Sequence, residues 1–182
     1  MTHRFRRRRP VALIVVVLLV VLAAMRLLRD PPRGAAPESL AEGTYRVGRV
    51  IDGDTLVLAN EARIRLIGAD TPETVKPNHP IEPFGPEATE FTRHFVRGGD
   101  VELVFDRERI DNYGRFLAYV HVEGQMLNEE LIRAGLATAE IGFNYGQPYK
   151  KRFTEAQDEA IDARRGIWSL DRPKDYPRRR RR

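Results

Sequence analysis

Apolar and polar residues alternate in short runs through the middle of the chain, as they do in β-strands with one buried face. The runs occupy residues 45–50, 55–58, 63–67, 101–105 and 116–122. Each has a length typical of one strand of a small sheet. Asp52 and Gly53 separate the first two runs, and glycine accepts the positive φ that tight hairpin turns require. The first two runs are therefore predicted to form a hairpin.

A helix is predicted to begin at residues 85–87, which read Gly-Pro-Glu. Proline suits the first helical turn, and a carboxylate suits the positive end of the helix dipole. The spacing of Ala88, Phe91 and Phe95 predicts the buried stripe of this helix, and Gly98 ends it.

Two more helices follow later in the chain. Asn128 is expected to cap a short helix that ends at Gly135, and a last helix is expected over residues 153–165. Five strands and three helices in about 130 residues predict a mainly β protein with helices. The fold expected from this pattern is a five-stranded barrel of the oligonucleotide/oligosaccharide-binding (OB) type.

An apolar run precedes this domain. It covers residues 11–25 without interruption and extends to residue 28 when Arg26 is passed over. Eighteen helical residues span roughly 27 Å, close to the thickness of one bilayer core. The five arginines before the run place the N-terminus in the cytoplasm. We expect a single-pass membrane protein with its domain outside the cytoplasm. The alternative is a cleaved signal peptide and a secreted domain.

These features divide the chain into five segments: a basic cytoplasmic N-terminus (1–10), a transmembrane anchor or uncleaved signal (11–28), a linker (29–43), the OB domain (44–170) and a disordered Arg-rich tail (171–182). The net charge is +5, but residues 41–177 hold 18 Lys and Arg against 24 Asp and Glu. The domain is therefore not expected to bind polyanions through a uniformly basic surface. The absence of cysteine excludes disulfides, Cys-ligated metals and thiol nucleophiles.

Acidic residues stand at the ends of predicted strands. Asp52 and Asp54 flank the hairpin glycine, and Asp70 follows the third strand. Because consecutive strands usually pair, these carboxylates can converge, and hard cations such as Ca²⁺ or Mg²⁺ bind several carboxylate oxygens. Pro72 fixes the backbone direction before Glu73. Taken locally, the same residues are also consistent with a plain turn and a loop.

Two arginines could complete such a site. Arg65 lies mid-strand and points away from its apolar neighbours, and Arg115 stands at the start of the fifth strand. A metal ion with two guanidinium groups would neutralise charge on a phosphodiester. Taken singly, each arginine is more simply explained as half of a surface salt bridge. The constellation requires no His, Cys or Ser nucleophile, so it favours direct attack by water.

Taken together, the motifs resemble the staphylococcal nuclease (thermonuclease) family over about residues 44–170. The motifs are, in chain order, VIDGDT (50–55), IRLIGADTPE (64–73), FGPEA (84–88), DNYGRFLAY (111–119), MLNEELI (126–132), GLA (135–137) and GIW (166–168). The resemblance implies a five-stranded OB barrel with three helices. It also implies Ca²⁺-dependent cleavage of DNA and RNA that leaves 3′-phosphate ends.

The resemblance also implies roles for individual residues. Asp54 and Asp70 would ligate Ca²⁺ through their carboxylates, and Thr71 through its backbone carbonyl. Glu73 would orient or deprotonate the attacking water. Arg65 and Arg115 would hold the scissile phosphate, with Arg115 near the leaving 5′-oxygen. Three residues have accessory roles by the same resemblance: Tyr113 would contact the substrate, Asp52 would lie behind the metal ligands, and Asp106 would be structural.

One position departs from the family pattern. The family has a tyrosine, shortly after the GLA motif, that packs on the nucleotide base. Ungapped extension puts Ile141 there, and Phe143 or Tyr145 would take its place if the loop shifts. Losing a base-stacking side chain costs about 1–3 kcal/mol of binding, so affinity or base preference would change while the chemistry continued.

The sequence thus favours a Ca²⁺-dependent nuclease that is a monomer, with DNA or RNA as substrate, the membrane as its attachment and no protein partner. One alternative is an OB module, tethered to the membrane, that holds nucleic acid without cutting it. Another is an envelope scaffold protein. The presence together of Asp54, Arg65, Asp70, Glu73 and Arg115 favours the enzyme.

Overall fold

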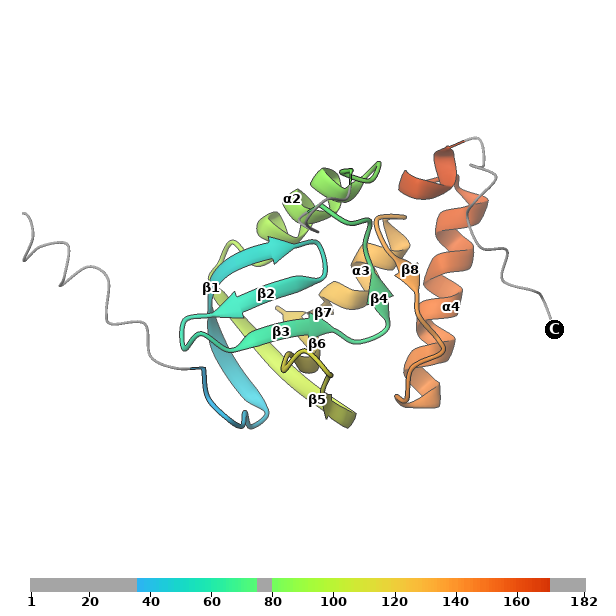
Figure 1. The fold of residues 1–182 in the computed structure, drawn as a ribbon. Helices are drawn as coiled ribbons and strands as arrows, with labels where there is room; N and C mark the ends of the chain where they lie inside the picture. Colours follow the sequence, from blue (N-terminus) through green and yellow to red (C-terminus); the bar gives the residue numbers. More distant parts are fainter. Residues whose placement is uncertain (1–35, 75–79, 171–182) are drawn as a thin grey trace, which may run out of the picture. The chain divides into compact units, whose positions relative to one another are not determined.

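The computed structural model describes residues 36–74 and 80–170 (Figure 1). Its strands are β1 (Gly43–Asp52), β2 (Thr55–Leu58), β3 (Arg63–Leu66), β4 (Ala69–Asp70), β5 (Asp100–Ile110), β6 (Phe116–Val122), β7 (Gln125–Met126) and β8 (Thr138–Ala139). Its helices are α2 (Gly85–Phe95), α3 (Leu127–Arg133) and α4 (Gln147–Asp162), followed by the short 3₁₀ helix η1 (Gly166–Ser169).

Five of the strands close into a barrel. The strand order is β3-β2-β1-β5-β6-β7, and β3 also pairs with β6. The β3–β6 ladder is parallel and sets Ile64 opposite Phe116, whereas the other ladders of this sheet are antiparallel. Inward-facing side chains such as Leu56, Ile64 and Leu103 are fully buried in the core. Within the described residues, the five predicted barrel strands and three predicted helices are therefore present, and the barrel is of the OB type.

The buried face of α2 differs from the predicted stripe. Ala88 is buried as expected, but Phe91 and Phe95 are only half-buried and stack on each other with ring centroids 6.1 Å apart. The fully packed positions are instead Thr89 and Thr92. Each threonine hydroxyl bonds to the β1–β2 turn, so α2 is attached to the turn through polar contacts that apolar periodicity does not reveal.

The predicted capping role of Asn128 is wrong. The residue before α3 is Met126, which provides no side-chain cap, and the helix begins at Leu127. The Asn128 side chain is fully buried: its Oδ1 accepts the Val120 N–H at 3.0 Å, and its Nδ2 donates to the Ile67 carbonyl at 2.9 Å. Asn128 therefore joins α3 to the end of the barrel where β3 meets β6.

Two other features escaped the sequence pattern. Helix α4 begins at Gln147, six residues before the expected start, and the two-residue β4–β8 ladder was not predicted. Helix α3 lies between the barrel and α4 (Figure 1), and Glu129 forms an ion pair with Arg152 of α4. This packing holds the segment that contains β8 beside the end of β4.

The predicted transmembrane segment (11–28) and Arg-rich tail (171–182) lie outside the described residues, as do the basic N-terminus and residues 29–35 of the linker. Over residues 36–74 and 80–170, every helix is too short or too polar to cross a bilayer.

Replacing Asn128 by alanine is expected to lower the free energy of unfolding by about 2–4 kcal/mol, since buried backbone groups lose their hydrogen-bond partners. Urea unfolding of the two proteins measures the difference. The matched control is Asn144→Ala at an exposed position, for which little change is expected. An equal loss in both variants would contradict the structural role of Asn128.

Candidate active site

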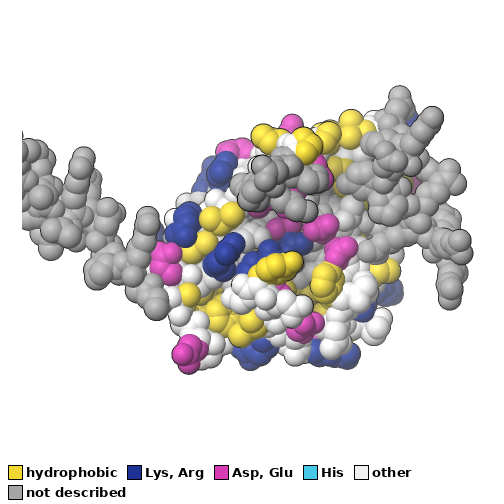
Figure 2. All heavy atoms as spheres, in the orientation of Figure 1, with side chains coloured by type: hydrophobic (Ala, Val, Ile, Leu, Met, Phe, Trp, Pro, Cys, Tyr) yellow, Lys and Arg dark blue, Asp and Glu magenta, His cyan; other side chains and the backbone are white. Residues whose placement is uncertain are grey.

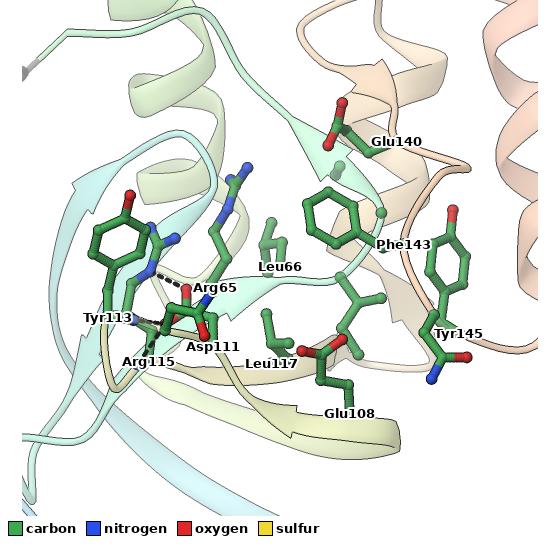
Figure 3. Close-up of a pocket in the computed structure, with 15 residues that line it drawn as sticks. Arg65, Leu66, Glu108, Asp111, Tyr113, Arg115, Leu117, Glu140, Phe143 and Tyr145 are labelled. Carbon is green, nitrogen blue, oxygen red and sulfur yellow. Dashed lines mark hydrogen bonds and ion pairs between the residues drawn. The ribbon is translucent and has the colours of Figure 1, made fainter.

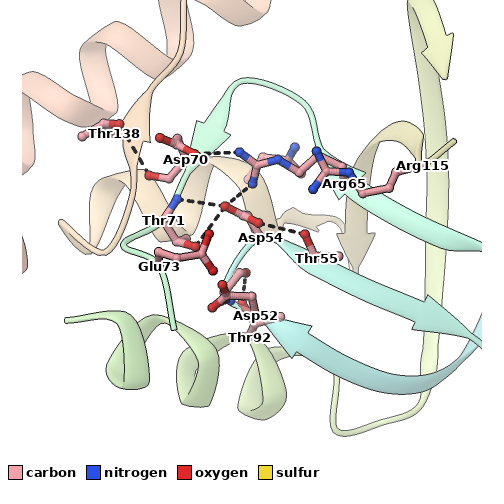
Figure 4. A network of polar contacts seen from close by, with 12 residues as sticks. Asp52, Asp54, Thr55, Arg65, Asp70, Thr71, Glu73, Thr92, Arg115 and Thr138 are labelled. Atoms are coloured by element: carbon pink, nitrogen blue, oxygen red, sulfur yellow. Dashed lines mark hydrogen bonds and ion pairs between the residues drawn. The ribbon is translucent and has the colours of Figure 1, made fainter. Parts of the chain in front are cut away.

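The site lies where the β1–β2 turn and the chain around β4 meet β3 and the start of β6 (Figure 4). The turn carries Asp54, β4 ends in Asp70, and Glu73 follows three residues later. Arg65 projects from β3 toward these acids, and Arg115 lies beside it. The structure therefore gathers in one region the carboxylates and guanidinium groups that the sequence singled out.

Of the two proposed carboxylate ligands, Asp54 is the more enclosed, with 10% of its side chain exposed against 50% for Asp70. Its Oδ2 accepts the N–H and the hydroxyl of Thr71, both at 3.0 Å, and forms an ion pair with Arg65. Its Oδ1 accepts the Thr55 hydroxyl at 2.9 Å. A buried carboxylate is costly without such partners, so these contacts fix the orientation of Asp54.

Arg65 links the two proposed metal ligands. Its guanidinium contacts Asp54 and also donates to Asp70 Oδ1 at 2.7 Å. Burial lowers the pKa of Arg65; Asp70 acts to raise it, and the nearby charge of Arg115 lowers it further. The net pKa lies below the ordinary value, chiefly because the guanidinium is buried. Two neighbouring guanidinium groups, those of Arg65 and Arg115, are suited to binding an anionic ligand.

The 111–115 loop orients Arg115. Asp111 Oδ2 accepts Arg115 Nε at 2.7 Å, and Asp111 Oδ1 accepts the N–H groups of Tyr113 and Arg115 at 2.9 and 3.0 Å. Gly114 completes the loop at a φ of +73°, where glycine is favoured. Asp111 belongs to the DNYGRFLAY motif, which by itself gives this residue no role. The signal for its role was present, because an aspartate that precedes a tight turn commonly accepts the N–H two residues on.

Asp52 is buried, but its oxygens are taken up by the surrounding backbone and hydroxyls. Asp52 Oδ1 accepts the N–H of Gly53 at 2.8 Å and the hydroxyls of Thr74 and Thr89 at 2.8 and 3.1 Å. A Cβ on Gly53 would lie 2.8 Å from both Ala88 and Thr71, so no larger residue fits there. Asp52 thus positions the turn, the chain after β4 and helix α2 relative to one another.

Glu73 is half-buried beside Asp54 (Figure 4). Its backbone N–H donates to the Glu82 carboxylate at 3.0 Å, and its carbonyl accepts the Glu82 N–H at 3.0 Å. These two contacts hold Glu73 and Glu82 together, although they are nine positions apart in the sequence. This double contact sets the backbone from which the Glu73 carboxylate projects.

A pocket lies beside the two arginines (Figure 3). Leu66 and Leu117 contribute apolar surface to it, and Tyr113 and Phe143 are exposed among its lining residues, with 81% and 52% of their surface accessible. Arg115 stacks on the Tyr113 ring at 5.4 Å from its centroid. Such a pocket presents aromatic and apolar surface to one part of a ligand and guanidinium groups to another.

The three candidates for the base-packing position separate clearly. Phe143 lines the pocket and is exposed. Tyr145 is almost fully buried and packs against Phe153, although it also borders the pocket. Ile141 is exposed but is absent from the pocket lining. Phe143 is thus the aromatic residue of the three that is available to a ligand.

Asp106 lies behind this loop and holds two segments together. Its Oδ2 accepts the Tyr119 hydroxyl at 2.8 Å and the Gly146 N–H at 2.9 Å. Burial acts to raise the pKa of Asp106, but these hydrogen bonds outweigh it and hold the pKa below its ordinary value. Burial and the same hydrogen bond raise the pKa of Tyr119. These contacts join the barrel to the start of α4.

The donor set suits a hard cation held by few protein ligands. Asp54 and Asp70 lie close enough to share one guanidinium group, so their oxygens can also face one metal ion. Among residues 36–74 and 80–170, no three acidic or histidine side chains form a cluster of the kind that encloses a metal. A cation here would therefore take its remaining ligands from backbone carbonyls and water.

The chain is similar in sequence to several known proteins. Residues 63–170 match the family described as staphylococcal nuclease homologue. The chain is 42% identical over 142 residues to a thermonuclease of Staphylococcus hyicus, covering 76% of this chain and 83% of the relative. It is 44% identical over 128 residues to a thermonuclease of Staphylococcus intermedius, covering 69% and 76%. Endonuclease YncB of Bacillus subtilis (strain 168) is 38% identical over 125 residues, covering 66% and 59%.

Asp111 provides a pH-dependent test of the arginine loop. Burial acts to raise the pKa of Asp111, but the hydrogen bonds from Arg115 and Tyr113 outweigh it and hold the pKa below the ordinary 3.8. Its contribution to stability is therefore full above that ordinary value and is lost as pH falls through the depressed one. We expect Asp111→Asn to have a lower free energy of unfolding than the native chain at pH 7. As the pH at which unfolding is measured falls from 7 to 3, this difference in free energy should become smaller below the ordinary pKa.

The control for loss of one carboxyl is Asp158→Asn on the exposed side of α4. A gap for Asp111→Asn that stays constant or widens toward acid pH would contradict the assigned role.

Proposed function

The chain belongs to the staphylococcal nuclease family, and we propose that it is a Ca²⁺-dependent nuclease that cleaves DNA or RNA and leaves 3′-phosphate ends. The observation that supports this most strongly is the juxtaposition of Arg65 and Arg115 with the Asp54–Asp70 pair. A phosphodiester needs cationic groups around its non-bridging oxygens, and this region offers them from two directions.

In the proposed reaction, Arg65 and Arg115 bind the scissile phosphate and stabilise the charge that develops on it. Glu73 orients the attacking water and accepts its proton, and the bond from phosphorus to the 5′-oxygen breaks. Arg115 would lie beside the leaving 5′-oxygen, which takes up a proton from solvent as the bond breaks. Asp54, Asp70 and the Thr71 carbonyl would hold Ca²⁺. When bound, the ion would supply further positive charge and polarise the phosphate.

We propose that the aromatic rim of the pocket holds the nucleotide. Phe143 would pack on the base in place of the family's tyrosine, and Tyr113 would contact a neighbouring phosphate or sugar. Stacking on an aromatic ring tolerates every base, so this contact would strengthen binding without strict sequence preference.

Two alternatives remain distinguishable from this proposal. A module that binds nucleic acid without cutting it would not need Glu73 directed beside Asp54 or Asp111 fixing Arg115. No feature of the described residues favours an envelope scaffold. All five proposed catalytic and metal-binding side chains are present, which supports the enzyme.

For its location, we propose that the enzyme acts outside the cytoplasm as a monomer, with the membrane as its attachment or after secretion. The support is the apolar run at residues 11–28 with its preceding arginines. Extracellular modules commonly bind Ca²⁺ with Kd of about 10⁻⁴–10⁻³ M, which suits a site with two carboxylate ligands.

Replacing Glu73 by glutamine is expected to lower the rate of single-stranded DNA cleavage about 10²–10⁴-fold, because the proton acceptor is lost. Cleavage by the full chain is followed with excess Ca²⁺, with Mg²⁺ and with a chelator. The control is Glu87→Gln on the exposed side of α2, for which the rate should stay within about twofold.

Cleavage by the native chain that persists in chelator would contradict the metal-dependent mechanism. Equal rates for Glu73→Gln and the native chain would remove Glu73 from it.

A further inference from the structure

One face of the barrel carries more arginines than the proposed reaction uses. Figure 2 shows Lys and Arg side chains distributed over the face formed by β1, β2 and β3. This is notable because residues 41–177 carry more acidic than basic side chains. We propose that Arg63 and Arg49 form a phosphate track that extends the active site along a single-stranded substrate. The inference rests on the proposed nuclease function and adds two substrate-binding residues outside the site already described.

The strand alternation places Arg63 on the same face as Arg65. Between them, Ile64 is fully buried in the core, whereas Arg63 is exposed and the Arg65 side chain points outward to the site. Residues two apart on a strand lie about 6.6 Å apart. That distance is comparable to the spacing of successive phosphates in an extended single strand. A phosphate next to the one at Arg65 can therefore reach Arg63.

The sheet register places the other two arginines on either side of Arg63. On one side, the parallel pairing of Ile64 with Phe116 sets Arg63 level with Arg115, one residue before β6. On the other side, Val57 of β2 pairs with both Arg63 of β3 and Arg49 of β1. Side chains of paired residues share a face, so the cations follow one line across the sheet, from Arg115 through Arg63 to Arg49.

These two arginines are available to a ligand. Among the residues that the structure describes, Arg63 forms no ion pair or side-chain hydrogen bond. Arg49 contacts Glu61 at 3.2 Å, but half of the Arg49 side chain is exposed. Exposed pairs of this kind are worth little and can exchange for a phosphate. By contrast, Arg133 is held by Glu129, Glu130 and Glu159 and is committed to the packing of α3.

The partner that fits the track is a single strand. The scissile phosphate must reach guanidinium groups whose side chains are only 15% and 23% exposed, next to a pocket with apolar and aromatic lining. An unpaired base can enter that pocket and stack on Phe143, whereas a paired base is held in its duplex. The backbone beyond the pocket would then lie along Arg63 and Arg49.

The test is binding of a labelled 12-nucleotide single strand to the full chain in chelator, measured by fluorescence anisotropy over a range of salt. Each phosphate contact in a single strand contributes about 0.7 to the slope of log K against log salt. Arg63→Gln is expected to reduce the slope by about that amount and weaken binding about 3–10-fold at 0.1 M salt. Arg63→Lys should restore the slope, because lysine also binds phosphate.

The matched control is Lys151→Gln on the exposed side of α4. It also removes one positive charge, but from a helix that is not part of the proposed track. It should leave the slope within error of the native value. Thermal unfolding of each variant checks that the fold is retained. The phosphate track would be overturned if the slope of log K against log salt for Arg63→Gln equalled the native slope. It would also be overturned if Lys151→Gln changed the slope by the same amount as Arg63→Gln.

Cleavage separates this inference from the proposed function. With Ca²⁺, Arg63→Gln should raise KM for the 12-nucleotide strand and leave its kcat at the native value. The rate of cleavage of a dinucleotide, which has one phosphodiester, should also equal the native rate. Loss of dinucleotide cleavage would instead place Arg63 at the scissile phosphate and overturn the track. The salt slopes of the native chain and Arg63→Gln could differ as expected while the native chain cuts neither substrate. In that case the nuclease proposal fails and the phosphate track stands.

Discussion

The contact between Asp54 and Arg65 is the interaction on which the rest of the site depends. Asp54 is almost enclosed, and a carboxylate in that position is stable only with donors around it. Arg65 supplies the charge, while Thr71 supplies an N–H and a hydroxyl. Because these residues come from the β1–β2 turn, β3 and the chain after β4, one buried charge aligns three segments. Asp70 directly precedes Thr71 and Glu73 follows it by two residues, so both are positioned as a consequence.

The closed barrel explains why distant residues meet there. The parallel β3–β6 ladder brings Arg115 beside β3, and the β4–β8 pair brings the chain near Phe143 to the same end of the sheet. The site therefore combines locally concentrated guanidinium groups with a domain whose overall charge is negative. Short-range contacts, and not the net field of the domain, would determine where a phosphate binds.

The sequence predicted the barrel well because alternation reports burial directly. It failed where polar side chains do the packing. Asn128 bonds to the barrel instead of capping its helix, and on α2 Thr92 is fully buried whereas Phe91 is only partly buried. The early start of α4 was recoverable, since Pro148 lies in its first turn. The site residues came from motifs, but periodicity could not show that Asp111 fixes Arg115, because that contact depends on the shape of one loop.

The most direct test is a crystal structure of the full chain with Ca²⁺ and a short phosphorothioate strand that resists cleavage. We expect one Ca²⁺ bound by Asp54 and Asp70, and the scissile phosphate within hydrogen-bond distance of Arg65 and Arg115. A metal ion bound away from both aspartates, or a phosphate that contacts neither arginine, would contradict it.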